Sequence, residues 1–294
     1  MRASTRQRIR KKAIPVAMAL LRAVLFTALT FVVIYPLLTK LCASFMALRD
    51  IHDMSVRYIP RHPTLSHYRD VWRQLELSAV YPLTVQFTAL VALLQTLSAT
   101  VAGYGLARFR FRLNGVFLAL ALVGTVVPPD LLLVPLFSEF RYFDPFGLVS
   151  LVTGGAPPSL IGTQWPLILL AVTCTGYRCG LFIFILRQFF RGMPRFLRIM
   201  LPGARTMMVT VFLFGFVWTW LDIKYIPTLM PDMPLLVTEV QKISSLGLDA
   251  SANTVARSLL VNAGAVYLIV PLVLLYLFTQ RYFVQSIERS GLVG

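Results

Sequence analysis

Five polar side chains stand inside long apolar stretches of the sequence, where each is costly unless it has a partner or lines a wet cavity. They are Gln86, Gln95, Asp130, Arg178 and Asn262. One interpretation is a polar path for a solute through a membrane. The other is hydrogen bonding between helices or subunits, and for each residue taken singly both stay open. Asp130 directly follows Pro128-Pro129, and paired prolines break a helix, so irregular backbone is expected there.

Patterns for enzymatic chemistry are missing from the sequence. It contains no GxxxxGK[ST] loop for ATP and no Gly-x-Ser-x-Gly or His-Glu-x-x-His motif. We therefore expect a protein that is not an enzyme and holds no metal or cofactor of its own. The three histidines, which we expect to be solvated, and the three cysteines, which we expect to be inert buried thiols, lack metal-site spacing: His52, His62, His67, Cys42, Cys174 and Cys179.

The composition indicates a protein embedded in lipid. Of the 294 residues 57% are hydrophobic and only 14% are charged, against about 25% charged in soluble domains. Six stretches approach the roughly 20 apolar residues that a membrane helix needs: about 23–45, 80–107, 115–137, 165–186, 204–220 and 256–279. The expected fold is all-α and polytopic, with one transmembrane domain over 23–279, a basic tail over 1–22 and a carboxyl tail over 280–294.

The charge distribution predicts the orientation. There are 28 basic and 12 acidic residues, for a net charge of +16. Four segments, 2–22, 108–112, 187–205 and 281–289, hold most of the basic residues and a single acid, Glu288. Because Lys and Arg gather on the cytoplasmic side, both termini are expected in the cytoplasm of a multi-pass cell-membrane protein. Nucleic-acid binding is disfavoured, since these charges are divided among segments that flank membrane spans.

Two further patterns concern packing. Small residues recur every four positions on the second stretch at Ala99, Gly103 and Ala107, which favours close helix contact in the bundle or between subunits. In the loop 47–77, Thr64 is a possible helix cap, and apolar residues follow at helical spacing, which predicts a short amphipathic helix on the outer surface. Trp218 and Trp220 fit an interfacial belt.

Several motifs, taken in order along the chain, resemble the permease subunits of carbohydrate-type ABC importers, the maltose-permease-like group. They are Pro63-Thr64-Leu65, the run Gly103-Tyr104-Gly105-Leu106-Ala107-Arg108-Phe109-Arg110-Phe111, Pro135-Leu136-Phe137, Arg187-Gln188-Phe189-Phe190, Met193-Pro194, Leu201-Pro202, Trp218-Thr219-Trp220 and Gln280-Arg281-Tyr282-Phe283-Val284. Each motif is weak alone, but together they cover nearly the whole chain and are specific.

The resemblance implies a six-helix permease half with the methionine-importer-like fold. It would pair with a second, similar permease, so a heterodimer is expected in the lipid membrane. Two cytoplasmic ATPase subunits would bind the ATP, and an extracellular solute-binding protein would deliver a sugar or oligosaccharide. The missing ATP site in this chain agrees with that division of labour.

The sequence departs from the family pattern at the cytoplasmic loop that docks in the ATPase. Family members carry a Glu-Ala-Ala stretch there. In this chain Arg195 is followed directly by Phe196, after which recognisable sequence resumes. A second departure lies near the end of the fifth stretch, where Leu221 stands between Trp220 and Asp222 in place of the Asn that the family usually shows. An alternative function is therefore a degenerate or structural subunit that assembles without coupling. What remains of the ATPase-facing loop is Arg187, Gln188, Arg191, Met193, Pro194, Arg195, Pro202 and Gly203.

Overall fold

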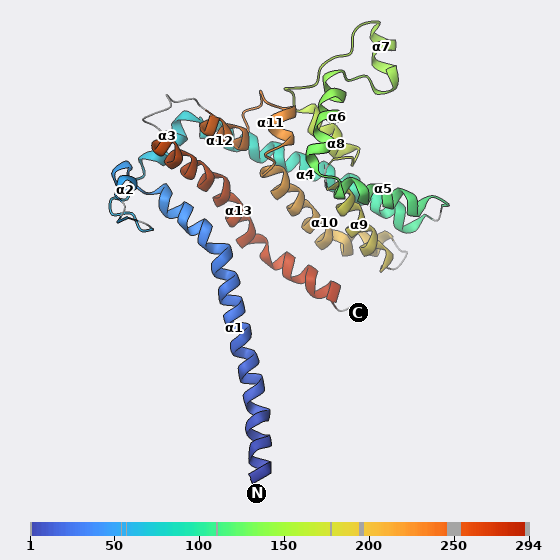
Figure 1. Ribbon diagram of the computed structural model, residues 1–294. Helices are drawn as coiled ribbons and strands as arrows, with labels where there is room; N and C mark the ends of the chain where they lie inside the picture. The colour runs from blue at the N-terminus through green and yellow to red at the C-terminus, as the bar shows by residue number, and fades with distance from the viewer. Residues whose placement is uncertain are drawn as a thin grey trace. The chain divides into compact units, whose positions relative to one another are not determined.

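The computed structural model describes residues 2–53, 55–56, 58–109, 111–176, 178–193, 197–245 and 254–291, and every regular element among them is a helix. The longer helices (Figure 1) are α1 (Arg2–Ser44), α4 (Leu77–Arg108), α5 (Asn114–Val126), α6 (Pro129–Arg141), α9 (Cys179–Arg191), α10 (Leu197–Trp220) and α13 (Thr254–Gly291). The shorter ones are α2 (Leu48–His52), α3 (Ser66–Gln74), η1 (Pro145–Gly147), α7 (Leu148–Thr153), α8 (Trp165–Val172), α11 (Tyr225–Leu229) and α12 (Leu236–Ser245).

Three helices in the described ranges are long and apolar enough to cross a membrane. They are Val16–Ser44 within α1, Leu77–Arg108 and Ala256–Gln280 within α13. A fourth span results if α5 and α6, which are bent by 103° relative to each other, are counted together. The all-helical fold with membrane-length helices is thus confirmed, while length and composition alone do not establish six spans.

The bend between α5 and α6 follows from the paired prolines. Val127 precedes Pro128 and is extended, with ψ of 127°, because a residue before proline is pushed out of the helical region. Pro129 then occupies the first turn of α6, where a missing N–H costs nothing. The irregular backbone expected beside Asp130 is found there.

The fourth apolar stretch, expected as one helix over 165–186, is divided into α8 and α9. The amides of Thr175 and Gly176 both donate to the carbonyl of Leu170, at 3.1 and 3.2 Å, which ends α8. Cys174 and Arg178 have positive φ values of 54° and 73°. The prediction of a continuous helix was wrong because small and polar residues turn the chain here without any proline.

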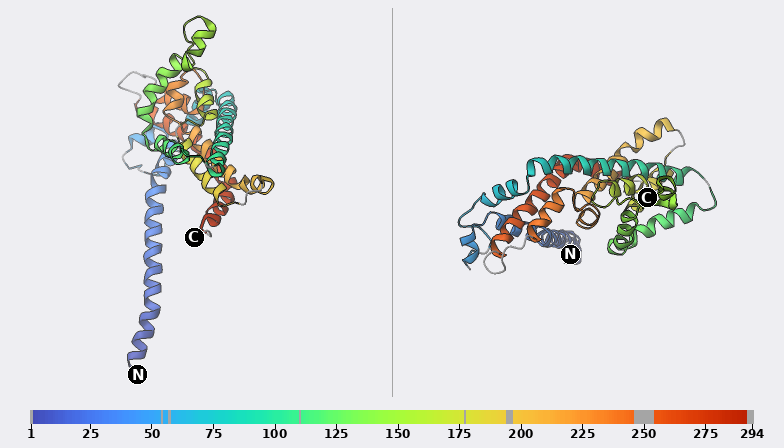
Figure 2. Two further views of the ribbon diagram at one scale, coloured as in Figure 1. Left: turned by 90° about the vertical axis from the view of Figure 1, so that its right-hand side faces the viewer. Right: turned by 90° about the horizontal axis from the view of Figure 1, so that it is seen from above.

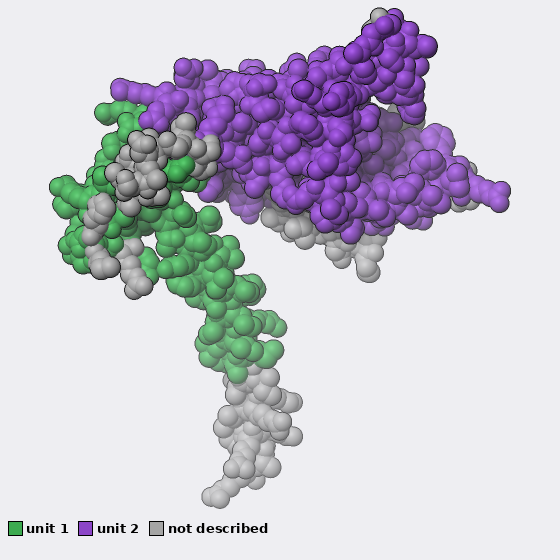
Figure 3. All heavy atoms as spheres, turned by 45° about the horizontal axis from the view of Figure 1, so that its top comes forward, with its two compact units in different colours: residues 1–70, 247–266 green, residues 71–246, 267–294 purple. Residues whose placement is uncertain are grey.

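The chain divides into two compact units, residues 1–70 with 247–266, and residues 71–246 with 267–294 (Figure 3). In the second unit α4 packs along α8, α9 and α10, and α5 packs on α9, as Figures 1 and 2 show. One buried cluster, which includes Phe87, Leu167 and Met230, joins α4 to α8 and α11. Another, with Ala99 and Phe182 among its members, joins α4 to α9 and α10.

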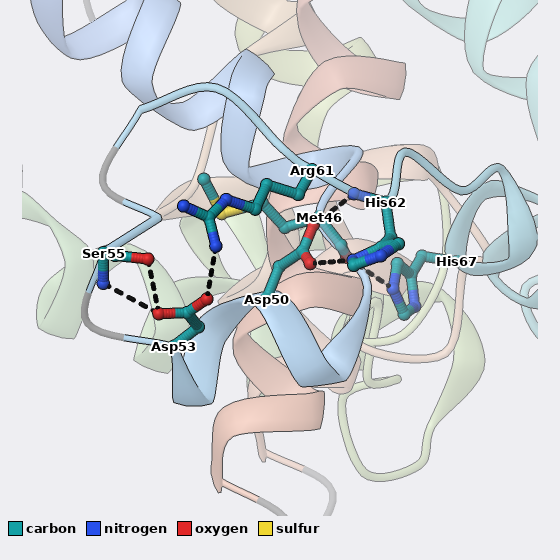
Figure 4. A network of polar contacts seen from close by, with 7 residues as sticks. All are labelled: Met46, Asp50, Asp53, Ser55, Arg61, His62 and His67. Atoms are coloured by element: carbon teal, nitrogen blue, oxygen red, sulfur yellow. Dashed lines mark hydrogen bonds and ion pairs between the residues drawn. The ribbon is translucent and has the colours of Figure 1, made fainter.

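In the first unit a polar network orders the loop after α1 (Figure 4). The buried carboxylate of Asp50 accepts the backbone amide of His62 at 2.8 Å and contacts its ring Nδ1 at 2.7 Å. His67 Nε2 lies 3.1 Å from the carbonyl of Met46. Two of the histidines expected to be solvated are therefore held by specific contacts, and His52 ends α2.

The amphipathic helix expected in this loop is confirmed as α3 (Ser66–Gln74). The Thr64 hydroxyl accepts the amide of Ser66 at 3.1 Å, which starts the helix. Val71 on α3 is fully buried.

Candidate functional site

A cavity of about 510 Å³ opens in the second unit. Apolar side chains from α4 and α8 form part of its wall. The break before α9, the end of α10, the segment leading to α11 and the first residue of α6 form the rest. The polar residues that line it are Gln95, Arg178, Thr219, Asp222 and Lys224. Its volume falls in the roughly 300–1,000 Å³ range of small-molecule sites, which are mostly apolar with a few placed polar groups.

Arg178 is held over the ring of Trp218. Its left-handed backbone, at φ of 73°, stands directly before α9, and its guanidinium carbon lies 4.3 Å from the Trp218 ring centroid. The Trp218 ring in turn stacks on Phe182 and Phe214, with centroids 5.3 and 5.6 Å apart. A cation over a tryptophan face is attractive by about 0.5–2 kcal/mol, so the aromatic cluster fixes the cation at the cavity wall.

Asp222 organises the part of the wall between α10 and α11. Its Oδ1 accepts the backbone amides of Lys224 and Tyr225 at 3.0 and 2.9 Å, and these bonds fix the start of α11. The cavity therefore presents a guanidinium group and a carboxyl group whose positions are set by aromatic and backbone contacts.

Asp130 reaches this site through an ion pair. Lys224 Nζ donates to the Asp130 carboxylate at 2.5 Å, which links the segment before α11 to the first turn of α6. The two side chains are 40% and 65% exposed, and such pairs contribute about 0–1 kcal/mol. Pro129, beside Asp130, lines the cavity, so this pair lies at its rim.

Gln95 connects α4 to the start of α9. It is 8% exposed, and its Nε2 donates to Cys179 Sγ at 2.9 Å. Cys179 is buried, but Cys42 and Cys174 are partly exposed, so the expectation that all three thiols are buried was wrong for two of them.

The remaining polar residues singled out in the sequence lie elsewhere. Gln86 is on an exposed face of α4 and does not line the cavity. Asn262 is buried on α13, within the first unit. Whether these residues serve transport or packing stays a prediction.

Sequence reasoning missed Lys224, and its prediction for Trp220 was wrong. Trp220 is 1% exposed and its Nε1 donates to the carbonyl of Leu268 at 3.0 Å, so it does not belong to an interfacial belt. The motif Trp218-Thr219-Trp220 with Asp222 was a usable signal for the cavity. No pattern in the sequence marked Lys224.

At the far end of α4 the small residues meet α9. A Cβ added to Gly103 would lie 3.0 Å from Leu186 Cβ and 3.1 Å from the backbone nitrogen of Arg187. Ala99 is fully buried, and Ala107 is partly buried against the same cluster. The two helix backbones thus approach closely within this chain, and a role of these residues between subunits stays a prediction.

Two arginines satisfy helix-end carbonyls in the same region. Arg187 Nε donates to the carbonyl of Leu106 at 3.3 Å, and Arg108 donates to that of Met193 at 2.8 Å. The last carbonyls of a helix lack partners within it, so these bonds tie the end of α4 to α9.

Some of the other residues of the expected ATPase-facing loop lie on α9 and α10, and the rest lie outside the described residues. Gln188 and Arg191 are exposed on α9, and a Cβ on Gly203 would lie 2.5 Å from Met193 Cε. Pro202 falls within α10. Pro194, Arg195 and the junction after Arg195 lie outside the described residues.

No family model matches the chain, but the known proteins to which it is similar are transport permeases. The probable ABC transporter permease protein YurM of Bacillus subtilis is 25% identical over 277 residues, covering 88% of this chain and 84% of the relative. The arabinooligosaccharides permease protein AraQ of Halalkalibacterium halodurans is 23% identical, covering 92% and 94%. The diacetylchitobiose uptake permease protein NgcG of Streptomyces coelicolor is 25% identical, covering 88% and 84%.

A solved structure supports the fold. A chain of a bacterial ABC transporter involved in import of the acidic polysaccharide alginate superposes with a TM-score of 0.67 at 18% identity, covering 90% of this chain and 96% of that one. The relatives of this chain are carbohydrate ABC transporter permeases, which confirms the family resemblance that its motifs indicated.

Proposed function

We propose that the chain is the transmembrane permease subunit of an ATP-driven, binding-protein-dependent importer for a sugar or oligosaccharide. The observation that carries this proposal is the cavity beside Arg178, which combines a cation, a carboxylate and amide and hydroxyl groups in an apolar wall. Sugars offer many hydroxyl groups that both donate and accept, so such a wall suits them. Relatives that match almost the whole chain support the proposal.

The cargo is a carbohydrate of small size. The relatives are described as permeases for arabinooligosaccharides, diacetylchitobiose and galactooligosaccharides. A cavity of about 510 Å³ lies within the size range of small-molecule sites, so a longer oligosaccharide would pass in a threaded, extended form.

The architecture that we propose has six spans in the methionine-importer-like arrangement. In chain order, the first two spans are α1 and α4, and the third is α5 together with α6. The fourth is α8 together with α9, the fifth is α10 and the sixth is α13. Both termini are cytoplasmic, on the evidence of the basic segments. The Asp130–Lys224 pair and the Arg178–Trp218 contact then lie along the solute path.

The assembly consists of this chain, a second permease, two ATPase subunits that bind ATP and an extracellular binding protein. The proposal assigns ATP hydrolysis to the ATPase subunits, because the sequence has no GxxxxGK[ST] loop. Because its ATPase-facing loop is short, the second permease makes the larger share of the contact with the ATPases. Nothing in the comparisons favours a purely structural subunit.

The test is uptake of labelled oligosaccharides in the source organism with and without the gene. We expect deletion to abolish uptake of at least one of arabinotriose, raffinose, trehalose and diacetylchitobiose, and the restored gene to recover it. Unchanged uptake of all four, together with unchanged growth on every other oligosaccharide supplied as the sole carbon source, contradicts the proposal.

A further inference from the structure

The segment between α6 and α8 forms a lobe, residues 142–160, whose base is closed. The amide of Phe143 donates to the carbonyl of Pro158 at 3.1 Å, and that of Leu160 to the carbonyl of Phe140 at 2.8 Å. Phe140 is 4% exposed and stacks on Phe143 with centroids 6.2 Å apart. Figures 1 and 2 show α7 at the tip, projecting from the rest of the second unit.

Hydrogen bonds also order the tip of the lobe. The Asp144 carboxylate accepts the amides of Val149 and Ser150 at 2.8 and 3.2 Å, and the Ser150 hydroxyl at 2.5 Å. Gly147 and Gly154, with φ values of 72° and 64°, bracket α7. The lobe is therefore a built element that holds its side chains in fixed directions.

This construction presents apolar side chains outward. Phe146 is 98% exposed, Val152 83% and Leu151 80%. Phe146 has φ of 60°, which is unfavourable for a bulky residue and is found where surrounding structure imposes it. Within the described residues Phe146 makes no buried contact that would offset the cost of this backbone conformation. We therefore expect the stabilising contact to come from another molecule.

The charge of the lobe distinguishes it from a solvated loop. Asp144 is the only charged residue between 142 and 160, and its carboxylate accepts hydrogen bonds from Val149 and Ser150 within the lobe. The loop 47–77, in contrast, carries charges throughout: Arg49, Asp50, Asp53, Arg57, Arg61, Arg69, Asp70, Arg73 and Glu76. A fully exposed aromatic and two aliphatic side chains without charged neighbours fit lipid better than water.

The lobe is also continuous with an exposed apolar surface on α6. The apolar segment that passes the length and composition test for a span together with α5 extends from Pro129 to Val152. Leu131 and Val134 on α6 are 68% and 72% exposed. α5 has 13 residues, about 20 Å at 1.5 Å per residue, which is short of the roughly 30 Å hydrocarbon core. The 103° bend then turns α6 and the lobe across the direction of α5.

We propose that the lobe docks in the lipid bilayer, with Phe146, Leu151 and Val152 inserted at the boundary between headgroups and acyl chains. Tyr142 at the base of the lobe is a residue type that gathers at that boundary. The contact anchors α6, and with it Asp130, against the membrane while the solute path changes shape. This surface is separate from the cavity and uses none of its residues.

Spin-label accessibility in the complete transporter, reconstituted in lipid nanodiscs, tests the proposal. Labels are placed at Phe146→Cys and Leu151→Cys, with the three native cysteines replaced by serine. Val134→Cys on α6 serves as the lipid reference and Ser66→Cys as the water reference. We expect the ratio of oxygen to nickel-chelate accessibility at 146 and 151 to match position 134 and to exceed position 66 severalfold.

Two results overturn the proposal. A ratio as low as that of position 66 places the lobe in water. Exclusion of both reagents with an immobilised spectrum shows that a protein surface, such as the second permease or the binding protein, covers it.

Because a label can distort the lobe, Phe146→Trp provides a second measurement that keeps an aromatic ring. Its added fluorescence should be quenched by lipids brominated near the glycerol end of the acyl chain. Full retention of that fluorescence overturns the proposal independently of the labels.

Discussion

Arg178 is the residue on which the proposed solute path most depends. Its guanidinium lies over Trp218 at 4.3 Å and borders the cavity. Arg178→Leu removes the cation from the cavity wall together with its contact on Trp218, which is worth about 0.5–2 kcal/mol. Where this energy acts on the rate-limiting step it corresponds to about two- to thirtyfold in rate, so we expect uptake to fall within that range while the amount of chain in the membrane is unchanged.

The matched control is Arg112→Leu, which removes an exposed arginine remote from the cavity-lining residues and should leave uptake within twofold. If Arg178→Leu transports like the parent chain, Arg178 serves packing alone. Arg178→Lys should keep part of the activity, since it retains the cation but not the planar stacking.

Asp144 makes the lobe sensitive to acid. The Ser150 hydroxyl lowers the pKa of Asp144 below its usual value of 3.8, against the effect of burial and with help from the amides of Ser150 and Val149. A lowered folded-state pKa stabilises the lobe above pH 3.8, and this contribution is lost as the pH falls through the folded-state value. A spin label at Leu151 should therefore become mobile only below about pH 4.

Asp144→Asn should make the same label mobile already at pH 7, since the amide accepts these hydrogen bonds more weakly than the carboxylate. Equal mobility of the two variants across the pH range contradicts the capping role of Asp144.

At this scale the sequence predicted part of the site. Arg178 and Gln95 could be found because charge and amide groups inside an apolar stretch need a purpose. Asp130 was found for the same reason, but Lys224 was not, because a lysine in a polar loop is unremarkable until the fold brings it to Asp130. Gln86 is also an amide in an apolar stretch, so the sequence did not distinguish it from Gln95. The two side chains lie on different faces of α4, and only Gln95 faces the cavity.

At the scale of elements, α9 approaches α5 through Gly180. A Cβ at this position would collide with the backbone carbonyl of Ala121 and with Thr125 Oγ1. Gly180→Ala forces two helix backbones apart, and overpacking of this kind costs about 1–3 kcal/mol. We expect the melting temperature of the variant in detergent, monitored by tryptophan fluorescence, to be several degrees lower than that of the parent chain.

Gly124→Ala on α5 is the control, because a Cβ there meets nothing within 4 Å. It should melt at or slightly above the temperature of the parent chain, since alanine favours a helix. Equal melting of both variants contradicts the close approach of α5 and α9.

The short loop after Arg195 predicts a weak ATPase contact. The exposed Arg191 can form ion pairs with an acidic surface, but each is worth only about 0–1 kcal/mol. Insertion of a family-type Glu-Ala-Ala segment after Arg195 should raise the amount of ATPase that co-purifies with the chain. A Gly-Ser segment of equal length is the control, and equal recovery from the native and the loop-restored chain refutes the prediction.

The elements were predictable where one physical signal dominated. Uninterrupted apolar sequence indicated α1, α4 and the membrane-length part of α13, and Pro128-Pro129 marked the bend between α5 and α6. The break between α8 and α9 was missed because it is formed by Gly176 and by side chains that hydrogen-bond the backbone, and not by a proline. Thr173 Oγ1 bonds the carbonyl of Leu169 at 2.7 Å, and such local bonds compete with a helix without leaving a strong mark on hydropathy.

At the scale of the whole molecule, the chain carries surfaces that require other molecules. α1 has large apolar side chains exposed around it, including Phe26 at 69% and Val32 at 68%. A helix that is apolar all round belongs in lipid or against other membrane helices. Together with the lobe and the cavity, this supports one subunit of a larger membrane assembly.

Whether the chain is a permease subunit is tested by the composition of that assembly. The chain, tagged at its carboxyl end, is purified from native membranes in mild detergent and its partners are identified by mass spectrometry. We expect a second permease and an ABC ATPase in stable association, with ATP hydrolysis by the purified complex. Recovery of the tagged chain alone, under conditions that keep other importers of the same cell intact, contradicts it.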